Sequence, residues 1–333
     1  MENTAPQRTD TRIGQPLTLA PDVACVQLSI VNVYLVGEPL AGDRSWVLVD
    51  AGLATSEPAI LRAAEERFGP GSRPSAIVLT HGHFDHVGSL RRLAERWDVP
   101  VYAHSLEMPY LTGRSDYPPP DPTVGGGAIA VLGSRTFPRH GINLGPRVRP
   151  LPADGSVPGM PGWLWIHTPG HTAGHVSLFR EEDRLLIAGD AFVTTRQESV
   201  YAVMTRKQEV WRPPAYFTTD WVAAKQSVQE LAALQPNIAA TGHGIPMTGQ
   251  EMLRQLAALA RDFDRVAVPP RGRYVRQPAL TDEHGVVSVP PPARDPMRLL
   301  LAAGAAAALG TMLFRGRSRG RGRRREDRTT DRF

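Results

Sequence analysis

His81, Gly82, His83, Phe84, Asp85 and His86 form one continuous stretch that holds four potential metal ligands within six residues. The apolar run before this stretch, residues 76–79, has the length of a short buried strand, and apolar side chains after it recur at helical spacing up to Trp97. The ligands are therefore expected in a loop between a strand and a helix. Imidazole nitrogens and carboxylate oxygens commonly hold divalent metal ions in enzymes. The stretch predicts a hydrolytic metal site.

Three later segments have a similar character, because each follows an apolar strand and contains glycine. They are residues 168–175 (Thr-Pro-Gly-His-Thr-Ala-Gly-His), residues 189–190 (Gly-Asp) and residues 242–244 (Gly-His-Gly). Short loops of this kind at strand ends let side chains converge at one edge of a sheet sandwich, where they can surround a cation. Together with the first stretch, the loops hold five of the ten histidines at candidate ligand positions.

With these motifs the chain resembles the metallo-β-lactamase fold superfamily of metallohydrolases over residues 23–266. Residues 81–86 match the family's His-x-His-x-Asp-His signature, and His171, Asp190 and His243 match its later ligands in order. Asp50 matches an early acidic residue that supports the metal site, and His175 is expected to support the site in the same way. The resemblance implies an α/β (α+β) fold, a four-layer αββα sandwich with the metals at one edge.

The resemblance also implies two groups of metal ligands. His81, His83 and His171 would hold one ion, Asp85, His86 and His243 the second, and Asp190 would bridge them. Asp85 and Asp190 are the expected catalytic carboxylates, and Asp85 could also shuttle a proton. Two Zn²⁺ ions are the expected cofactors, and iron or manganese is compatible with the same donors. A hydroxide between the two ions would be the nucleophile, because two cations lower the pKa of bound water to about 7.

The run 168–175 and the bridging Asp190 are similar to the glyoxalase II-like and lactonase-like branches, which cleave thioesters, lactones and other acyl bonds. True β-lactamases usually lack the combination of His86 and Asp190. Two departures limit the match: the chain after Val266 turns Pro-rich instead of continuing into a helical glutathione-binding extension, and residues 191–195 lack the tyrosine of homoserine-lactone lactonases. We therefore expect a small-molecule acyl substrate of undefined identity.

Residues 191–220 follow the bridging ligand and are the first candidates for a substrate wall, with core packing as the open alternative. The candidate substrate residues are Tyr201, Arg206, Trp211 and Tyr216. A second hypothesis is a mononuclear iron persulfide dioxygenase of the same fold that uses only His81, His171 and Asp190. A nuclease, a β-lactamase and a non-enzymatic binding protein are less favoured, and nucleic acid is an unfavoured partner because the catalytic part is nearly neutral.

The chain is expected to contain one hydrolase domain, residues 22–267, after a flexible segment, residues 1–21, and before a Pro-rich linker, residues 268–296. Residues 116–162 are crowded with Pro and Gly and are expected to be a long irregular excursion, either a substrate cover or a surface insertion. Cys25 is the only cysteine, which excludes an intrachain disulfide, and it is expected in a buried strand. Residues 1–21 hold no continuous apolar run, which predicts a cytoplasmic location.

The net charge of +5 belongs to the C-terminal tail. Residues 315–333 contain nine Arg against three acidic residues, a charge of +6 that leaves −1 for everything before Arg315. Residues 297–314 are expected to form a short apolar helix, and residues 315–333 an Arg-rich disordered tail. A span normally needs about 20 apolar residues, so spanning, docking of residues 297–325 on an anionic membrane surface, and a soluble tail all stay open. No pattern indicates an oligomeric state.

Overall fold

The computed structural model describes residues 13–124, 137–196, 205 and 207–293. All helices and strands given below belong to one compact unit, Met1–Pro292. The apolar segment 297–314, the Arg-rich tail and two candidate substrate residues, Tyr201 and Arg206, lie outside the described residues. Within the described part, no helix combines the length and the apolar character needed to cross a membrane.

The first sheet has seven strands that follow one another in sequence order. They are β1 (Pro16–Ala20), β2 (Val23–Gln27), β3 (Asn32–Val36), β4 (Val47–Val49), β5 (Ala76–Val78), β6 (Val101–Ala103) and β7 (Val148–Pro150). Strands β1 to β4 are antiparallel, whereas β4 to β7 are parallel, with Val49 opposite Val78. This register places Asp50 and the 81–86 loop, which follow β4 and β5, at the same edge of the sheet.

The second sheet has six strands in the order β13-β12-β11-β10-β9-β8. They are β8 (Ser156–Val157), β9 (Met160–His167), β10 (Val176–Arg180), β11 (Leu185–Gly189), β12 (Ile238–Thr241) and β13 (Met247–Thr248). The pair β11 and β12 is parallel, and β10 runs antiparallel to β9 and β11. The loop before β10 and the residues after β11 and β12 therefore meet at one edge. These are the three segments that carry His171, Asp190 and His243.

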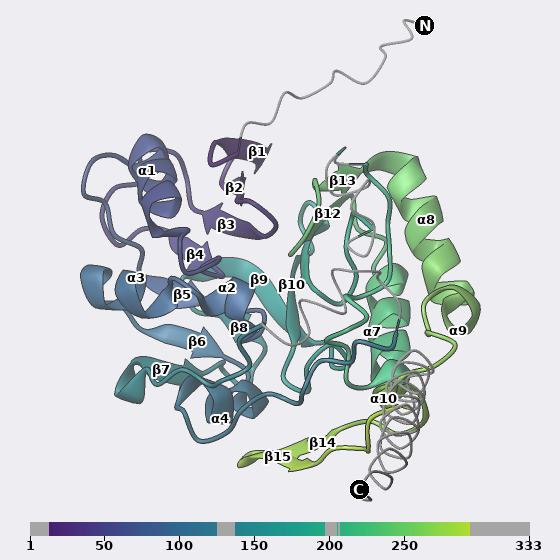
Figure 1. Cartoon of the computed structure of the whole chain (residues 1–333). Coiled ribbons are helices and arrows are strands. Elements are labelled where there is room, and N and C mark those ends of the chain that lie inside the picture. The colour runs from purple at the N-terminus through teal and green to yellow at the C-terminus, as the bar shows by residue number, and fades with distance from the viewer. Residues whose placement is uncertain (1–12, 125–136, 197–204, 206, 294–333) are drawn as a thin grey trace, which may run out of the picture. The chain divides into compact units, whose positions relative to one another are not determined.

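Helices cover the outer faces of the two sheets (Figure 1). On the side of the first sheet lie α1 (Glu57–Phe68), α2 (Phe84–Val87), α3 (Leu90–Trp97), α4 (Met108–Leu111) and the short 3₁₀ turns η1 (Ser105–Glu107) and η2 (Gly145–Arg147). On the side of the second lie α7 (Trp221–Ala233), α8 (Gly249–Arg261), α9 (Phe263–Val266) and α10 (Arg273–Arg276). In α3 the apolar residues that recur in the sequence are the buried ones, as their spacing predicts.

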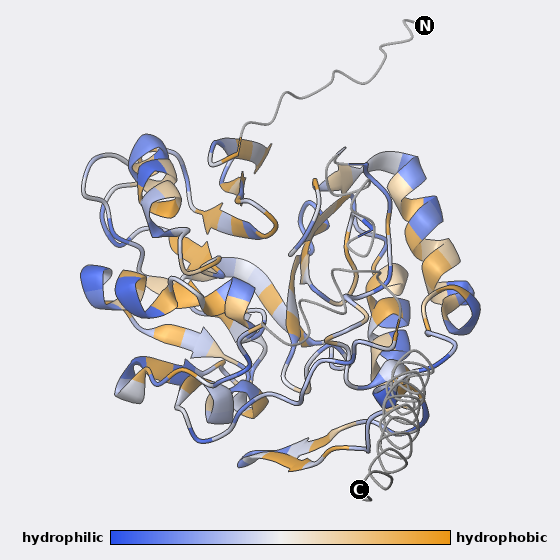
Figure 2. Cartoon of the chain, viewed as in Figure 1, coloured by the Kyte–Doolittle hydropathy of each residue, from blue (hydrophilic) through white to orange (hydrophobic). Residues whose placement is uncertain are grey.

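Three apolar clusters hold these layers together. One packs α1 and α3 on the first sheet, one packs α7 and α8 on the second, and the third lies between the sheets and includes the buried thiol of Cys25. Figure 2 shows the central strands as mainly hydrophobic and the outward turns of α8 as hydrophilic. Because both faces of each sheet are covered, strands such as β10 and β11 are buried at every residue. The αββα sandwich expected from the sequence is confirmed.

Two expectations about segments outside the domain core are wrong. The expectation of a flexible segment over residues 1–21 is wrong for residues 16–20, which form β1, an edge strand paired with β2, while residues 1–12 lie outside the described residues. The Pro-rich residues 268–292 are not a linker, because they form α10 and the hairpin of β14 (Leu280–Asp282) and β15 (Gly285–Ser288) within the compact unit. The prolines stand between these elements, so their density hides short regular pieces from a reading based on composition.

The excursion 116–162 is also more regular than expected. It contains η2, β7 and β8, and the long strand β9 begins at its end. The start of this segment contacts the rest of the domain, because the Tyr117 hydroxyl donates a hydrogen bond to Glu107 beside the candidate site. Gly159 lies in the turn between β8 and β9 with φ +76°, a conformation that favours glycine, and Gly162 lies near the start of β9 with φ +80°.

Candidate metal centre

Seven predicted ligands from the two sheets converge at one edge of the sandwich. Three sets of side chains bring their ligand atoms within 4.8 Å of one another: His81 with His83 and His171, His81 with His86 and Asp190, and Asp85 with His86 and His243. The rings of His81 and His171 approach to 4.9 Å between centroids. The first sheet supplies the 81–86 loop, and the second supplies the other three ligands, so the group exists only where the sheets meet.

Asp190 lies between the two groups. Its Oδ2 is 3.1 Å from His243 Nε2 and 3.4 Å from His171 Nε2, and its Oδ1 is 3.6 Å from His86 Nε2. His83 Nδ1 lies 2.9 Å from His171 Nε2 in the first group, and Asp85 Oδ2 lies 3.4 Å from His243 Nε2 in the second. Asp190 thus has one neighbour in the first group and two in the second, which is the position expected of a bridging ligand.

The donor set fits a divalent metal ion. His81 Nε2, His86 Nε2 and Asp190 Oδ1 are buried and have no hydrogen-bond partner in the described structure. A buried polar atom without a partner costs about 1 to 3 kcal/mol, so three of them facing one point are expected only where something else satisfies them. Imidazole nitrogens and carboxylate oxygens suit zinc, iron or manganese.

Asp50 orients two candidate ligands, His86 directly and His81 through Thr80. Its Oδ2 lies 2.8 Å from His86 Nδ1, and its carboxylate accepts hydrogen bonds from Thr80 N and Thr80 Oγ1, both at 2.8 Å. Thr80 Oγ1 lies 3.1 Å from His81 Nδ1, which extends the contact to a second ring. With Nδ1 engaged, each imidazole presents Nε2 to the site. The backbone of Asp50 has φ +62°, an uncommon conformation that the tight end of β4 imposes.

His175 is not placed as a ligand. Its Nε2 accepts a hydrogen bond of 2.9 Å from the backbone N–H of Asp190, and its Nδ1 lies 3.1 Å from the carbonyl oxygen of Thr168. Both ring nitrogens are therefore occupied by the chain. The ring therefore holds the backbone of Asp190, in the supporting position that the family resemblance implied.

Burial and charge divide the histidines of the site into two kinds. Burial, followed by neighbouring imidazoles, holds the pKa of His81 well below 6.5. Burial also lowers the pKa of His171 well below its usual value and that of His83 to about 3, so these rings stay neutral and keep a lone pair for a metal. Burial lowers the pKa of His86 too, but the carboxylates of Asp190 and Asp50 outweigh it and raise that pKa above 6.5.

The pKa of the Asp190 carboxylate is lowered by its neighbours. Burial raises its pKa, but the nearby rings of His243 and His86 outweigh burial and hold the pKa well below 3.8. The carboxylate of Asp190 is therefore ionised at neutral pH, as a metal ligand must be.

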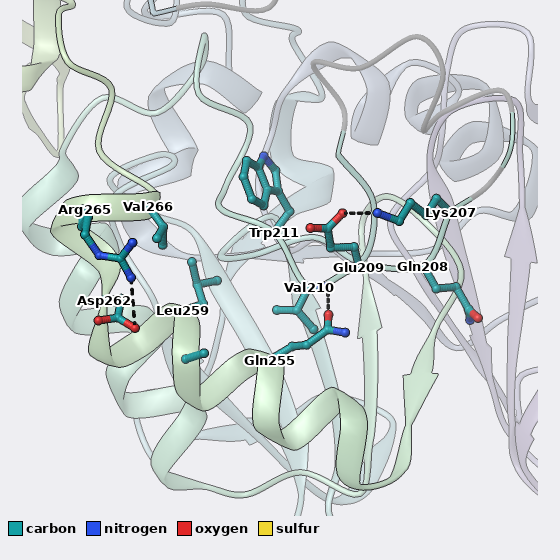
Figure 3. Close-up of a pocket in the computed structure, with 11 residues that line it drawn as sticks. Lys207, Gln208, Glu209, Val210, Trp211, Gln255, Leu259, Asp262, Arg265 and Val266 are labelled. Carbon is teal, nitrogen blue, oxygen red and sulfur yellow. Dashed lines mark hydrogen bonds and ion pairs between the residues drawn. The ribbon is translucent and has the colours of Figure 1, made fainter.

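The four candidate substrate residues do not form one group in the described structure. Tyr216 belongs to a group of aromatic rings at the site: it lies 4.9 Å from Phe217, and Phe217 lies 4.8 Å from the ring of His83. Trp211 instead lines a pocket of about 450 Å³ whose walls include none of the seven ligands. Figure 3 shows this pocket between α8 and residues 207–211, with ion pairs of Lys207 with Glu209 and of Arg265 with Asp262. Tyr201 and Arg206 lie outside the described residues.

The sequence reasoning missed Glu107 and Tyr117. Glu107 ends η1, just after β6, and is fully buried, while the ring of Tyr117 lies 4.8 Å from that of His83. Neither residue belongs to a motif. The one signal available was topological: β6 is parallel to β5, so residues that follow β6 emerge at the ligand edge.

Comparisons with known proteins agree with this arrangement. Residues 26–243 match the sequence profile of the metallo-beta-lactamase superfamily. The chain is 49% identical over 258 residues to "Probable metallo-hydrolase YflN" of Bacillus subtilis, covering 78% of this chain and 97% of that protein. It is 33% identical over 174 residues to "Acyl-coenzyme A thioesterase MBLAC2" of Gallus gallus, covering 48% and 56% of the two chains.

Solved structures show the same fold. A beta-lactamase domain protein from Burkholderia ambifaria superposes with a TM-score of 0.52 at 21% identity, covering 77% of this chain and 79% of that one. The profile match covers most of the chain and includes the ligand loops, and the close relative matches almost over its full length. The chain is a member of the metallo-beta-lactamase superfamily.

Proposed function

We propose that this protein is a metal-dependent hydrolase that cleaves the acyl bond of a small thioester, ester or lactone with two divalent metal ions, zinc foremost. The observation that carries the proposal is the position of Asp190, whose two oxygens face ligands of both groups. A site for a single ion would leave the second group, Asp85, His86 and His243, without a purpose at this edge.

The residues of the site would have distinct roles. His81, His83 and His171 would hold one ion, Asp85, His86 and His243 the other, and Asp190 both. When bound, the ions would supply a water of lowered pKa and polarise the substrate carbonyl. Among the seven candidate ligands Asp85 is the most exposed, at 8%, which supports a role in accepting and returning a proton.

Aromatic side chains beside the ligands support an acyl substrate with an apolar part. Phe84 stands between two ligands in the chain, stacks on Phe137 at 5.2 Å and is only partly buried. Phe137 in turn lies 5.6 Å from Phe217, which contacts His83. Partly exposed rings next to a reaction centre offer apolar area to a ligand. The acyl-coenzyme A thioesterase among the relatives cleaves a bond of the proposed kind.

The proposal is tested by metal analysis followed by a substrate panel. We expect about two metal ions per chain and hydrolysis of acyl thioesters or lactones, with kcat/KM rising from acetyl to longer or aromatic acyl groups. Asp190→Asn should reduce turnover by at least 100-fold, because it removes the ionised bridge between the groups. His284→Ala is the matched control, since this histidine is 79% exposed on the hairpin and should leave turnover unchanged.

Two results would contradict the proposal. Hydrolysis that persists after complete chelation would show that no metal takes part. About one iron per chain, with oxygen consumed on a persulfide and no acyl hydrolysis, would favour the mononuclear dioxygenase of the same fold.

A further inference from the structure

Glu107 is a fully buried carboxylate that forms no salt bridge with any described residue. A buried carboxylate without a cation is expensive unless hydrogen-bond donors surround it. Burial raises the pKa of this group, while four hydrogen-bond donors act against burial. Nothing in the proposed reaction uses this carboxylate directly, so its retention in the interior calls for another role.

All four donors to Glu107 come from the surroundings of the first metal group. Oε2 accepts a 2.9 Å hydrogen bond from the backbone N–H of Gly82, which separates His81 from His83, and another from the hydroxyl of Tyr117. Oε1 accepts from Thr172 Oγ1 at 2.7 Å and from the backbone N–H of Gly174 at 3.1 Å. One oxygen therefore holds the loop from the first sheet, and the other holds the loop from the second.

The glycines in these loops fit this contact. A Cβ atom added to Gly174 would lie 2.8 Å from Glu107 Cγ, its backbone nitrogen and its Oε1, and one added to Gly82 would meet the Tyr117 hydroxyl and, at 3.3 Å, Glu107 Oε2. A side chain at Gly174 would therefore clash with Glu107 itself, and a side chain at Gly82 would clash with the Tyr117 hydroxyl that Glu107 binds. Tyr117, which is hydrogen-bonded to Glu107, packs against His83 with 4.8 Å between the ring centroids.

The second metal group is held by other partners. His86 is oriented by Asp50, and His243 Nδ1 lies 2.5 Å from the carbonyl oxygen of Ile30. Among the described residues, the carboxylate of Glu107 accepts hydrogen bonds from Gly82, Tyr117, Thr172 and Gly174, none of which belongs to that group. Glu107 therefore holds only loops of the first group, although Asp50 also reaches His81 of that group through Thr80.

We propose that Glu107 is a positioning residue that fixes the 81–83 loop and the 171–174 loop relative to each other and so sets the metal affinity of the first group. The proposal rests on the metal centre of the proposed function but not on its reaction. A carboxylate supplies two acceptors, one for each loop. Glu107→Gln keeps one acceptor and turns an NH₂ group toward the donors of the other loop, which breaks one side of the clamp with little change in volume.

The test titrates metal-free protein with Zn²⁺ by calorimetry and repeats the titration with Co²⁺, whose visible spectrum reports ligand geometry. Loss of an outer support of a metal site costs about 10- to 100-fold in affinity. We expect Glu107→Gln to weaken one of two binding steps by that factor, to leave the other within threefold, and to change the Co²⁺ spectrum. Tyr117→Phe removes one hydrogen-bond donor to Glu107 and keeps the aromatic ring in the core. It should weaken the same metal-binding step by a smaller factor.

Asp121→Asn is the matched control. Asp121 is also a buried carboxylate, 2% exposed, and accepts hydrogen bonds from Thr123 N at 3.0 Å and from the backbone N–H of Arg273, which belong to no ligand loop. It should lower the melting temperature and leave both binding steps unchanged. The proposal is overturned if Glu107→Gln lowers the melting temperature as Asp121→Asn does while both affinities and the spectrum stay as in the wild type. Because no substrate is present, failure of the hydrolase proposal would not affect this result.

Discussion

His171 and His175 lie in one loop, four residues apart, and the contacts of each ring decide whether it can bind metal. His171 Nε2 lies 2.9 Å from His83 Nδ1 and faces Asp190, whereas the Nε2 of His175 accepts the backbone N–H of Asp190. The sequence motif presents both as candidate ligands, and only the resemblance separated them. Hydrogen-bond partners across 15 residues of chain are not visible in spacing, which is why the pattern alone leaves the choice open.

Replacing each of these two histidines by glutamine should separate their roles. His171→Gln should lower the bound metal from about two ions per chain to about one after dialysis, because it removes a ligand of the first group. His175→Gln should retain the wild-type metal content, since a glutamine can still accept from the Asp190 N–H. The measurement is elemental analysis of dialysed protein. Loss of an ion from His175→Gln would show that this ring binds metal after all.

At the scale of elements, the strands that precede the candidate ligands were predictable from the sequence, as were the supporting residues Asp50 and His175, but the short elements η1 and α10 were not. Residues 76–79, 185–188 and 238–240 are short apolar runs followed by glycine-containing loops, and each appears in the structure as a buried strand. These short elements could not be predicted because they contain few residues of mixed composition. Glu107 lies on a three-residue 3₁₀ turn, and α10 has only four residues. Periodicity needs a longer window than such pieces provide.

The C-terminal pieces are nevertheless anchored to the domain. Tyr274 on α10 is 2% exposed and donates a 2.6 Å hydrogen bond to the carbonyl oxygen of Pro119. In the hairpin, Val286 N donates to Ser115 Oγ at 3.2 Å. These contacts attach residues 273–288 to the start of the 116–162 excursion, so the segment expected to be a linker instead fastens a segment that reaches the metal centre through Tyr117.

Tyr274→Ala should therefore destabilise the protein as a core substitution does. Truncation of a buried aromatic side chain costs about 3 to 5 kcal/mol, so the urea midpoint should fall clearly. Val287→Ala on β15 is the control, because Val287 is 63% exposed and a surface change of this kind alters stability by about 0.5 kcal/mol or less. If residues 268–292 were a linker, the two variants would unfold alike.

For the whole molecule, the metal centre depends on the packing of two halves. The first sheet carries His81, His83, Asp85 and His86, and the second carries His171, Asp190 and His243, while the apolar cluster between the sheets sets their separation. The sequence predicted the order of these ligands and, through the family resemblance, the αββα layers. It could not predict the distances across the interface, because those follow from side chains that pack from both halves at once.

Stability against pH shows how burial of histidines acts on the whole fold. Burial, followed by the charge of His167, lowers the pKa of His104 to about 4, and His104 is not a ligand. An unfolded histidine has a pKa of about 6.5, so between pH 6.5 and 4 the unfolded chain binds a proton that the folded chain does not. The contribution of His104 to the unfolding free energy is therefore fully present above pH 6.5 and is lost as the pH falls toward 4.

His86 and His243 act in the opposite direction, because nearby carboxylates raise their folded pKa values despite burial. The pH slope of the metal-free protein is thus a sum of opposing contributions, and only a comparison of variants isolates one of them. The stability advantage of wild type over His104→Gln should shrink as the pH falls from 6.5 to 4.5, measured by urea unfolding of metal-free protein. Parallel curves for wild type and His104→Gln would contradict a lowered pKa of the partly buried His104.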